Sequence, residues 1–260
     1  MFRVVVPARY GSTRLPGKVL IPLHGKPMLQ WVFERARACR AEEVLIASDD
    51  GRIARVARRF GAEVVETAVS HSSATDRIAE VAWRRGWRDD DIVVNLQADE
   101  PLMPPALIEQ AAELLEADPS AGMATLASPI GSLAEFLDPN VVKVVVDASG
   151  RALYFSRAPI PWDRDAAPAG VASQQSFSGA LRHLGIYAYR VETLRSIAAT
   201  TPSPLERMEK LEQLRALEIG CAIRVACARE PPGPDVNTPE DLERVLALLP
   251  PGIASVTPDC

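Results

Sequence analysis

The chain has 260 residues, of which 47% are hydrophobic, enough to build one large packed domain or two small ones. Its net charge of −5 argues against wholesale binding to nucleic acid or to an anionic membrane surface, so any cationic site must be local. We expect a cytoplasmic protein with no signal peptide and no transmembrane helix, because no apolar run reaches about 18 residues. The four cysteines have no C-x-x-C or zinc spacing, which fits a reducing compartment.

The first predicted strand leads into a basic loop. Residues 4–6 are β-branched and predict a buried strand, which Pro7 closes because proline cannot donate to the strand ladder. The following loop carries glycine, proline, hydroxyl side chains and three fixed cations, which are Arg9, Arg14 and Lys18. Such a loop can wrap a polyphosphate, although a solvated turn has the same composition. It matches neither the Walker loop nor the G-x-G-x-x-G fingerprint.

Helical and strand patterns then alternate along the chain, which predicts an α/β fold with a mainly parallel sheet and right-handed crossovers. Helices are predicted at residues 26–38, 52–60, 75–86, 105–117, 202–219 and 239–249, and strands at 43–48, 62–65, 91–97, 123–128, 141–146, 152–157, 181–190 and 222–226. Residues 165–178 are rich in Ala, Gly, Ser and Gln and predict a variable loop, and 250–260 a frayed tail.

Two polar segments lie where the pattern changes from loop to helix or from strand to loop. Ser73 or Thr75 can cap the helix at 75–86, and backbone N–H groups there could instead bind a base edge or a phosphate. Asp99 follows the strand at 91–97, at the edge of an open sheet where ligands bind, so it could hold a divalent cation or simply cap the turn.

The second half of the chain offers candidate groups for a polar ligand. In the strand at 181–190, two-residue spacing places His183, Gly185 and Tyr187 on one face, which could cover a polyhydroxylated sugar or merely pack. Apolar residues recur at helical spacing in 202–219, so one face of that helix is expected in the core or a dimer interface. Thr238, with Pro at the next position, begins the last helix as a capping box.

Several of these stretches resemble the motifs of sugar-acid cytidylyltransferases, most specifically those of the 3-deoxy-manno-octulosonate (KDO) cytidylyltransferases. The matching segments are 7–18, 71–77, 95–101, 154–164, 182–187 and 235–242, and the resemblance spans residues 3 to about 247. It implies a three-layer, Rossmann-like nucleotide-diphospho-sugar transferase fold with a mixed central sheet. It also implies a single domain over 1–249, with 151–190 as a cap and dimerisation region.

The resemblance further implies an enzyme that joins CTP and KDO into CMP-KDO and pyrophosphate, for lipopolysaccharide biosynthesis, as a homodimer that uses Mg²⁺. The catalytic residues it implies are Arg14, Lys18 and Asp99. Those implied to bind CTP are Arg9, Ser12, Arg14, Lys18, Ser73 and Thr75. Those implied to face the sugar acid are Gln97, Arg157, His183, Tyr187, Glu206 and Gln213, with a solvated helix face as the alternative for Glu206 and Gln213.

The chain departs from the family pattern at four positions, one of which is Asp235, where the pattern has glycine. Ala74 and Ala98 replace glycines, which are small-for-small changes. Asn237 stands where the family has its second magnesium-binding Asp, and an amide oxygen is a weaker ligand for a hard cation than a carboxylate. Asp235 lies two residues earlier on the same face, so we expect Asp99, Asp235 and Asn237 to form the metal site. The alternatives are an enzyme for a related acid sugar, or a degenerate homologue that binds CTP without turnover.

Overall fold

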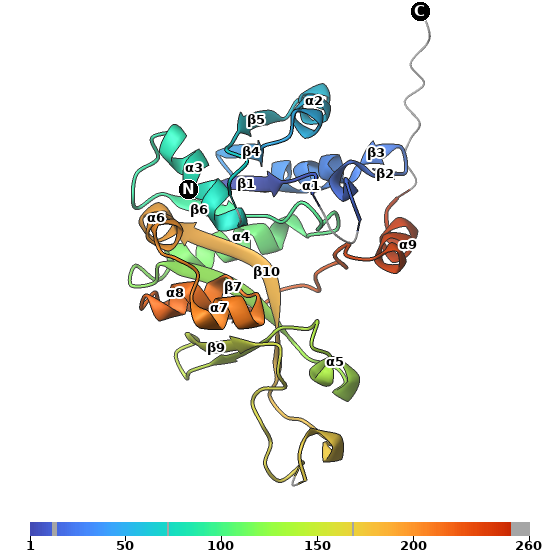
Figure 1. Cartoon of the computed structure of the whole chain (residues 1–260), viewed down its shortest axis with the longest axis vertical. Helices are drawn as coiled ribbons and strands as arrows, with labels where there is room; N and C mark the ends of the chain where they lie inside the picture. The colour runs from blue at the N-terminus through green and yellow to red at the C-terminus, as the bar shows by residue number, and fades with distance from the viewer. Residues whose placement is uncertain (12–14, 72, 168, 251–260) are drawn as a thin grey trace, which may run out of the picture.

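A mixed β-sheet forms the centre of the molecule in the computed structural model, which describes residues 1–11, 15–71, 73–167 and 169–250 (Figure 1). Within those residues, seven strands form the order β11-β7-β10-β6-β1-β4-β5, and β8 and β9 join it through β10. The strands are β1 (Phe2–Ala8), β4 (Glu43–Ser48), β5 (Glu63–Glu66), β6 (Ile92–Asn95), β7 (Met123–Pro129), β8 (Lys143–Val146), β9 (Ala152–Ser156), β10 (Leu181–Arg190) and β11 (Ile223–Cys227). A separate two-stranded sheet pairs β2 (Pro22–Leu23) with β3 (Lys26–Pro27).

The N-terminal part of the sheet is parallel, as the alternating pattern predicts. β1 pairs in parallel with both β4 and β6, and β4 with β5. β10 is antiparallel to its neighbours β6 and β7, which makes the sheet mixed. The predicted α/β class with a mixed, mainly parallel sheet is therefore confirmed.

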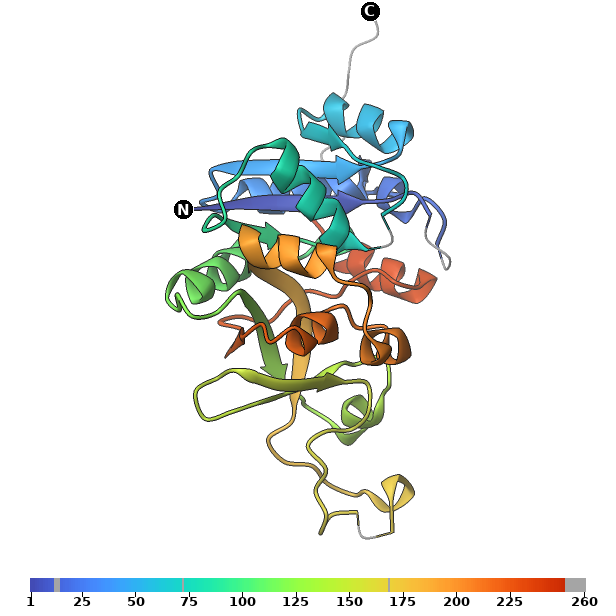
Figure 2. The same ribbon diagram turned by 60° about the vertical axis from the view of Figure 1, so that its left-hand side comes forward.

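Helices cover both faces of the sheet and make three layers (Figures 1 and 2). The helices are α1 (Met28–Arg37), α2 (Gly51–Arg59), α3 (Ala74–Arg84), α4 (Pro105–Glu116), α5 (Leu133–Leu137), α6 (Val191–Ala199), α7 (Pro204–Glu209), α8 (Gln213–Glu218) and α9 (Pro239–Leu248), with 3₁₀ turns η1 (Lys18–Leu20) and η2 (Val171–Ser173). Apolar residues of α1, α2 and α4 pack in one cluster against one face, and those of α3, α6 and α8 pack in another.

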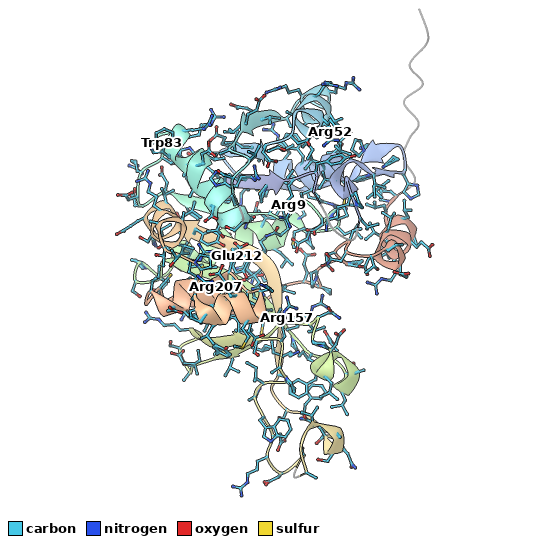
Figure 3. The ribbon with its side chains drawn as sticks, in the orientation of Figure 1. Arg9, Arg52, Trp83, Arg157, Arg207 and Glu212 are labelled. Atoms are coloured by element: carbon cyan, nitrogen blue, oxygen red, sulfur yellow. The ribbon has the colours of Figure 1, made fainter. Side chains whose placement is uncertain are left out.

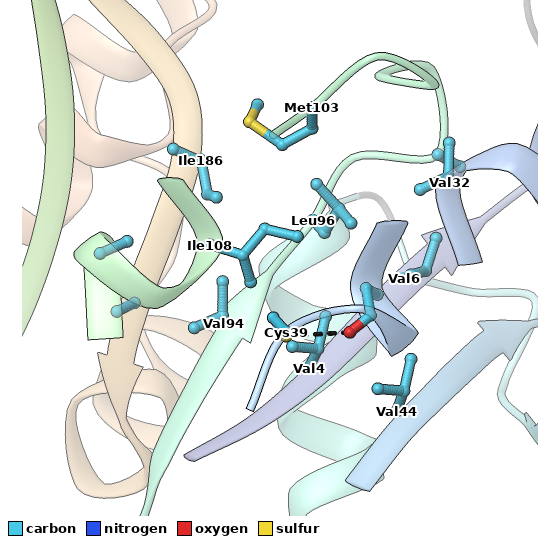
Figure 4. Close-up of a cluster of buried hydrophobic side chains, with 14 of the residues drawn as sticks. Val4, Val6, Val32, Cys39, Val44, Val94, Leu96, Met103, Ile108 and Ile186 are labelled. Carbon is cyan, nitrogen blue, oxygen red and sulfur yellow. Dashed lines mark hydrogen bonds between the residues drawn. The ribbon is translucent and has the colours of Figure 1, made fainter. Parts of the chain in front are cut away.

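Strand β1 contributes to both clusters because successive side chains point to opposite faces. Val4 and Val6 pack with the α1 and α4 side, whereas Val5 packs with the α3 side, and all three are fully buried. Figure 4 shows the first cluster, where Leu96 and Ile108 meet the two valines. This two-sided burial fixes the carboxyl ends of β1 and β6, from which the candidate site is built.

The predicted helix caps are confirmed. The Ser73 side chain accepts a hydrogen bond from the Asp76 backbone N–H at the start of α3. Thr238 and Asp241 form the expected reciprocal capping box at α9. A second capping box joins Ser203 and Glu206 at α7.

The single helix predicted at 202–219 is wrong. Lys210 adopts a left-handed backbone conformation (φ 56°), which ends α7, and α8 begins at Gln213. The apolar row consequently divides, because Met208 is 79% exposed while Leu211 and Leu214 are buried. The sequence analysis also missed α6, which packs against α3.

The segment between β9 and β10 extends away from the sheet at the bottom of Figures 1 and 2. Its returning end is anchored by a small cluster of apolar side chains, in which the Phe136 and Phe177 rings stack with centroids 5.2 Å apart. No helix in the described part of the chain is long and apolar enough to cross a membrane.

Candidate functional site

The basic loop after β1 is closed at its base. The Gly17 backbone N–H donates to the Tyr10 carbonyl at 3.0 Å, and Gly17 has φ 69° with the Tyr10 ring beside it. The Arg52 guanidinium of α2 lies 3.4 Å from the centre of the Tyr10 ring, a cation–π contact that fixes this tyrosine. Ser12 and Arg14, both predicted ligands, lie outside the described residues.

Lys18 joins this loop to two distant segments. Its Nζ donates to Asp99 Oδ2 at 2.5 Å, to the Val236 carbonyl at 2.9 Å and to Asn237 Oδ1 at 3.5 Å. The predicted catalytic pair Lys18 and Asp99 is therefore in direct contact, and the predicted metal-binding segment before α9 lies against both. These groups meet because β1 and β6 are adjacent parallel strands whose carboxyl ends share one edge.

Three carboxyl groups gather at this edge. Burial raises the pKa of Glu100 well above its ordinary value, and the nearby Asp99 and Asp235 raise it further. The pKa of Asp235 is likewise raised by burial and then by Asp99. The Asn237 amide donates to Asp235 Oδ2 at 2.5 Å, so the two predicted ligands of the second metal position touch each other. The concentration of negative charge favours a cation here, and Lys18 supplies one positive charge.

The oxygen-bearing side chains at this edge can hold a divalent cation only if water or a bound substrate supplies further ligands. Two carboxylates (Asp99 and Asp235) and the Asn237 amide oxygen offer the oxygen chemistry that Mg²⁺ prefers. In the described residues, however, no three His, Cys, Asp or Glu side chains are grouped so that they could hold a metal alone. Magnesium usually takes one or two carboxylates and fills its remaining positions with water and substrate phosphates, which this set would allow.

The start of α3 forms the next part of the site. Ser73 lies on the cavity wall and caps the helix. Thr75 is not on that wall. It is 2% exposed, and its hydroxyl donates to Glu212 Oε2 at 2.7 Å. Burial raises the pKa of Glu212, which is on the wall. The Thr75 side chain thus links α3 to the segment before α8, and its role in binding CTP stays a prediction.

Strand β10 supplies the opposite wall, with His183 and Tyr187 facing the cavity as predicted. The His183 ring packs edge-on against Phe155, with centroids 5.0 Å apart, and lies 5.2 Å from the Tyr187 ring. Burial, and then the charge of Arg182, lowers the pKa of His183 to about 3, so its imidazole is neutral at pH 7.

These elements enclose a cavity of about 450 Å³, a size typical of small-molecule sites. The predicted residues on its wall are Arg9, Ser73, Gln97, Asp99, His183, Tyr187, Gln213 and Asp235. The buried Gln213 amide nitrogen has no hydrogen-bond partner in the described residues, which leaves it free to donate to a ligand. Figure 3 labels Arg9 and Glu212, two residues of this wall, near the middle of the molecule with Arg9 above Glu212.

Arg157 and Glu206 are not on the wall of this cavity. The Arg157 guanidinium donates to the carbonyls of Glu209 (2.7 Å) and Pro139 (3.0 Å). Glu206 is buried and forms a two-pronged ion pair with Arg215, with N···O distances of 2.6 and 2.7 Å. Both side chains therefore bind other parts of the protein instead of facing the cavity.

The sequence analysis missed several charged groups of the wall, which are Arg77, Glu100, Arg182, Lys210 and Glu212. Arg182 was assigned to the opposite strand face from His183. The pairing register of β10 with β7 shifts between His183 and Tyr187, and this bulge disturbs strict alternation. In the sequence, Arg182 and Glu212 each lie next to a predicted site residue. That adjacency could have identified both as candidates for the cavity wall.

Comparison with known proteins gives one consistent result. The sequence profile of a family described as cytidylyltransferase matches residues 3–224. A 3-deoxy-manno-octulosonate cytidylyltransferase from Thioalkalivibrio sulfidiphilus is 58% identical over 248 residues, 95% of this chain and 98% of the relative. One from Halorhodospira halophila is 54% identical, over 95% of this chain and 96% of the relative.

Solved structures agree with the sequence relatives. A CMP:2-keto-3-deoxy-manno-octonic acid synthetase complexed with CTP aligns with TM-score 0.84 at 41% identity, over 95% of this chain and 98% of that one. A cytidylyltransferase from Leptospira borgpetersenii aligns with TM-score 0.60 at 17% identity, over 94% of this chain and 84% of that one, and shares the fold.

Proposed function

This chain belongs to the cytidylyltransferase family, among the 3-deoxy-manno-octulosonate cytidylyltransferases, and from that premise we propose that it transfers CMP from CTP to KDO. The anomeric hydroxyl of KDO forms a bond to the α-phosphorus of CTP, the bond from that phosphorus to the bridging oxygen breaks, and pyrophosphate leaves. The hydroxyl proton passes to solvent. The observation that carries the proposal is one cavity whose wall includes both Arg9 of the phosphate loop and the polar face of β10.

The nucleotide half of this site consists of cations and helix-start N–H groups. We assign Arg9, Arg14 and Lys18 to the triphosphate, where their charge would stabilise the negative charge growing on pyrophosphate. Ser12 and the N–H groups near Ser73 complete the assignment, since a helix start attracts anions. Thr75 supports this segment from behind through its bond to Glu212.

The sugar half consists of buried polar groups. Gln97, His183, Tyr187 and Gln213 offer donors and acceptors to a polyol, and the unpartnered Gln213 amide supports its assignment. A cation must neutralise the carboxylate of the sugar acid, and Arg182 is on the cavity wall whereas Arg157 is not.

We propose Mg²⁺ as the cofactor, held by Asp99, Asp235 and Asn237 together with phosphate oxygens. When bound there, magnesium would supply Lewis acidity toward the phosphate and lower the pKa of the attacking hydroxyl. The contact between Asn237 and Asp235 supports the idea that Asp235 provides the charge that Asn237 lacks. We expect Asp235→Asn to raise the magnesium concentration needed for half-maximal rate at least tenfold, and Asn237→Asp to leave it equal or lower. Full activity and unchanged magnesium dependence in Asp235→Ala would exclude this role.

We also propose that the protein is a cytoplasmic homodimer that serves lipopolysaccharide biosynthesis. Exposed apolar side chains on α7 and β9 support self-association, because Met208 is 79% exposed and Leu153 59%. Light scattering after size-exclusion chromatography would give the mass, and a monomer at micromolar concentration would contradict the dimer.

The experiment that tests the function is pyrophosphate release by the purified protein with magnesium and CTP, with and without KDO. We expect release that depends on KDO. A panel of acid sugars, including a sialic acid and an amino-KDO, would detect a different preferred substrate. CTP binding without release for any sugar would instead indicate a degenerate homologue.

A further inference from the structure

A buried threonine lies behind the sugar-facing wall. Thr125 of β7 is fully buried, opposite the bulge at which the register of β10 shifts between His183 and Tyr187. Its hydroxyl oxygen is 2.7 Å from the Ile186 carbonyl oxygen, 3.1 Å from the Leu184 carbonyl oxygen and 3.0 Å from His183 Nε2. A bulge takes carbonyl groups out of the regular ladder, and here the hydroxyl satisfies them.

Counting protons fixes the direction of these hydrogen bonds. The Thr125 hydroxyl has one proton, and both carbonyl oxygens can only accept, so the proton points to them. The lone pairs of the hydroxyl oxygen then face His183 Nε2, which must donate. His183 is therefore the tautomer with its proton on Nε2, and Nδ1 carries a lone pair.

The other ring nitrogen is available to a ligand. The imidazole is neutral, because burial and Arg182 lower its pKa to about 3. In the described residues no hydrogen bond to Nδ1 is found, and the His183 side chain is on the cavity wall. A bare imidazole nitrogen accepts from a hydroxyl and repels a carboxylate, so His183 can recognise the polyol part of a sugar acid but not its carboxylate.

We propose that Thr125 is a positioning residue, which holds His183 with Nε2 as donor so that Nδ1 accepts a hydrogen bond from a substrate hydroxyl. The inference deepens the proposed function and rests on it for the identity of the substrate. The same hydroxyl also fixes the bulge that directs Tyr187 into the cavity, so one buried group outside the cavity orients two groups on its wall.

The direct test reads the tautomer of His183 in the free protein by long-range ¹H–¹⁵N NMR. The chain has three histidines, and the spectrum of a His183→Gln variant identifies the signals of His183. We expect the Nε2–H form in the wild type and in Thr125→Ser, which keeps the hydroxyl. We expect Thr125→Val, which removes it, to show the Nδ1–H form or a mixture. An Nδ1–H form in the wild type would overturn the inference, whether or not the valine variant folds.

Kinetics with CTP and KDO give the second readout. Loss of one oriented hydrogen bond predicts about a tenfold higher KM for KDO in Thr125→Val, with the KM for CTP unchanged and Thr125→Ser close to wild type. A merely structural threonine would leave both KM values unchanged in the folded variant, and that result would contradict the role. If the wild type had no activity with KDO, the proposed function would fail, whereas the tautomer measurement would still decide the role of Thr125.

Discussion

The two halves of the cavity obtain their polar groups in different ways. The nucleotide half uses groups at the ends of two elements, the carboxyl end of β1 and the start of α3. The sugar half uses a group held by another strand, since Thr125 of β7 holds His183 of β10, and behind its wall Arg215 of α8 pairs with Glu206 of α7. The nucleotide half carries charges that a substrate can neutralise. In the sugar half, by contrast, neutral groups are held in position without a substrate.

This difference predicts different responses to substitution. In the nucleotide half, removing a charge should affect catalysis more than stability, because charged groups such as Lys18 and Asp99 are partly exposed in the site, at 15% and 24%. In the sugar half, removing a buried partner should cost stability, since it leaves another polar group unpaired. Substitutions in each half can test this difference between effects on catalysis and effects on stability.

The largest effect is expected at Asp99. Asp99→Asn removes a carboxylate that contacts Lys18 and is assigned to magnesium, so we expect kcat to fall about 10³-fold, or ~4 kcal/mol in barrier. Steady-state pyrophosphate release measures it. Asp90→Asn, at an exposed carboxylate, is the matched control and should keep wild-type kcat. A loss of less than tenfold at Asp99 would remove it from the catalytic set.

The next effect concerns stability in the sugar half. Glu206→Gln leaves the buried Arg215 guanidinium with only its longer ion pair, to Asp76 at 3.6 Å, and we expect the free energy of unfolding to fall by about 3 kcal/mol. Urea denaturation of the wild type and variant measures it. Because Glu206 is not on the cavity wall, the KM for KDO should change by less than about threefold.

A control double variant removes the charges of both Glu206 and Arg215. The double variant Glu206→Leu and Arg215→Met should be less destabilised than Glu206→Gln, because no buried guanidinium remains and Asp76, which loses its 3.6 Å ion pair, is partly exposed. A large rise in the KM for KDO in a stable Glu206→Gln protein would restore Glu206 as a sugar ligand and break the comparison.

The sequence predicts the nucleotide half well because its determinants are local. Periodicity identifies the strands and helices before residue 117, and a serine followed by a helical pattern identifies the cap at Ser73. Lys18 and Asp99 meet because parallel strands align their carboxyl ends, which follows from the βαβ pattern alone.

The sugar half was predicted less well because its determinants are tertiary. The left-handed Lys210 breaks a stretch that has helical periodicity throughout, and across the break Glu206 of α7 pairs with Arg215 of α8. The bulge in β10 likewise receives hydrogen bonds from the Thr125 hydroxyl, 58 residues before His183. The bulge and the left-handed turn are not indicated by spacing within their own segments, whereas Arg157 was predicted from the resemblance of residues 154–164 to the family.

A smaller effect is expected from the buried neutral imidazole. The pKa of His183 is about 3 in the native protein and near 6.5 in the unfolded chain, so the unfolded chain binds the extra proton as the pH falls below 6.5. Its contribution to stability is complete above pH 6.5 and is lost progressively toward pH 3. Between pH 6.5 and 5 the loss should be about 2 kcal/mol. Denaturation curves of wild type and His183→Gln at both pH values isolate it, and equal pH dependence would contradict a neutral buried imidazole.

The smallest effect concerns the choice between two arginines. Arg182 is on the cavity wall, and its side chain is 41% exposed with one long ion pair to Glu135 at 3.6 Å. Arg157 instead donates to two backbone carbonyls. We expect Arg182→Gln to raise the KM for KDO about tenfold, since a partly solvated guanidinium–carboxylate contact contributes roughly 1–2 kcal/mol.

Arg157→Gln is the matched variant, with the same change of side chain. It should lower the melting temperature by a few degrees through the two lost hydrogen bonds, while the KM for KDO stays within about twofold. The opposite pattern, with KM raised only in Arg157→Gln, would mean that the loop between β9 and β10 rearranges to bring Arg157 to the substrate. The sugar half would then resemble the nucleotide half, because a charged side chain would reach its binding position only when the substrate is present.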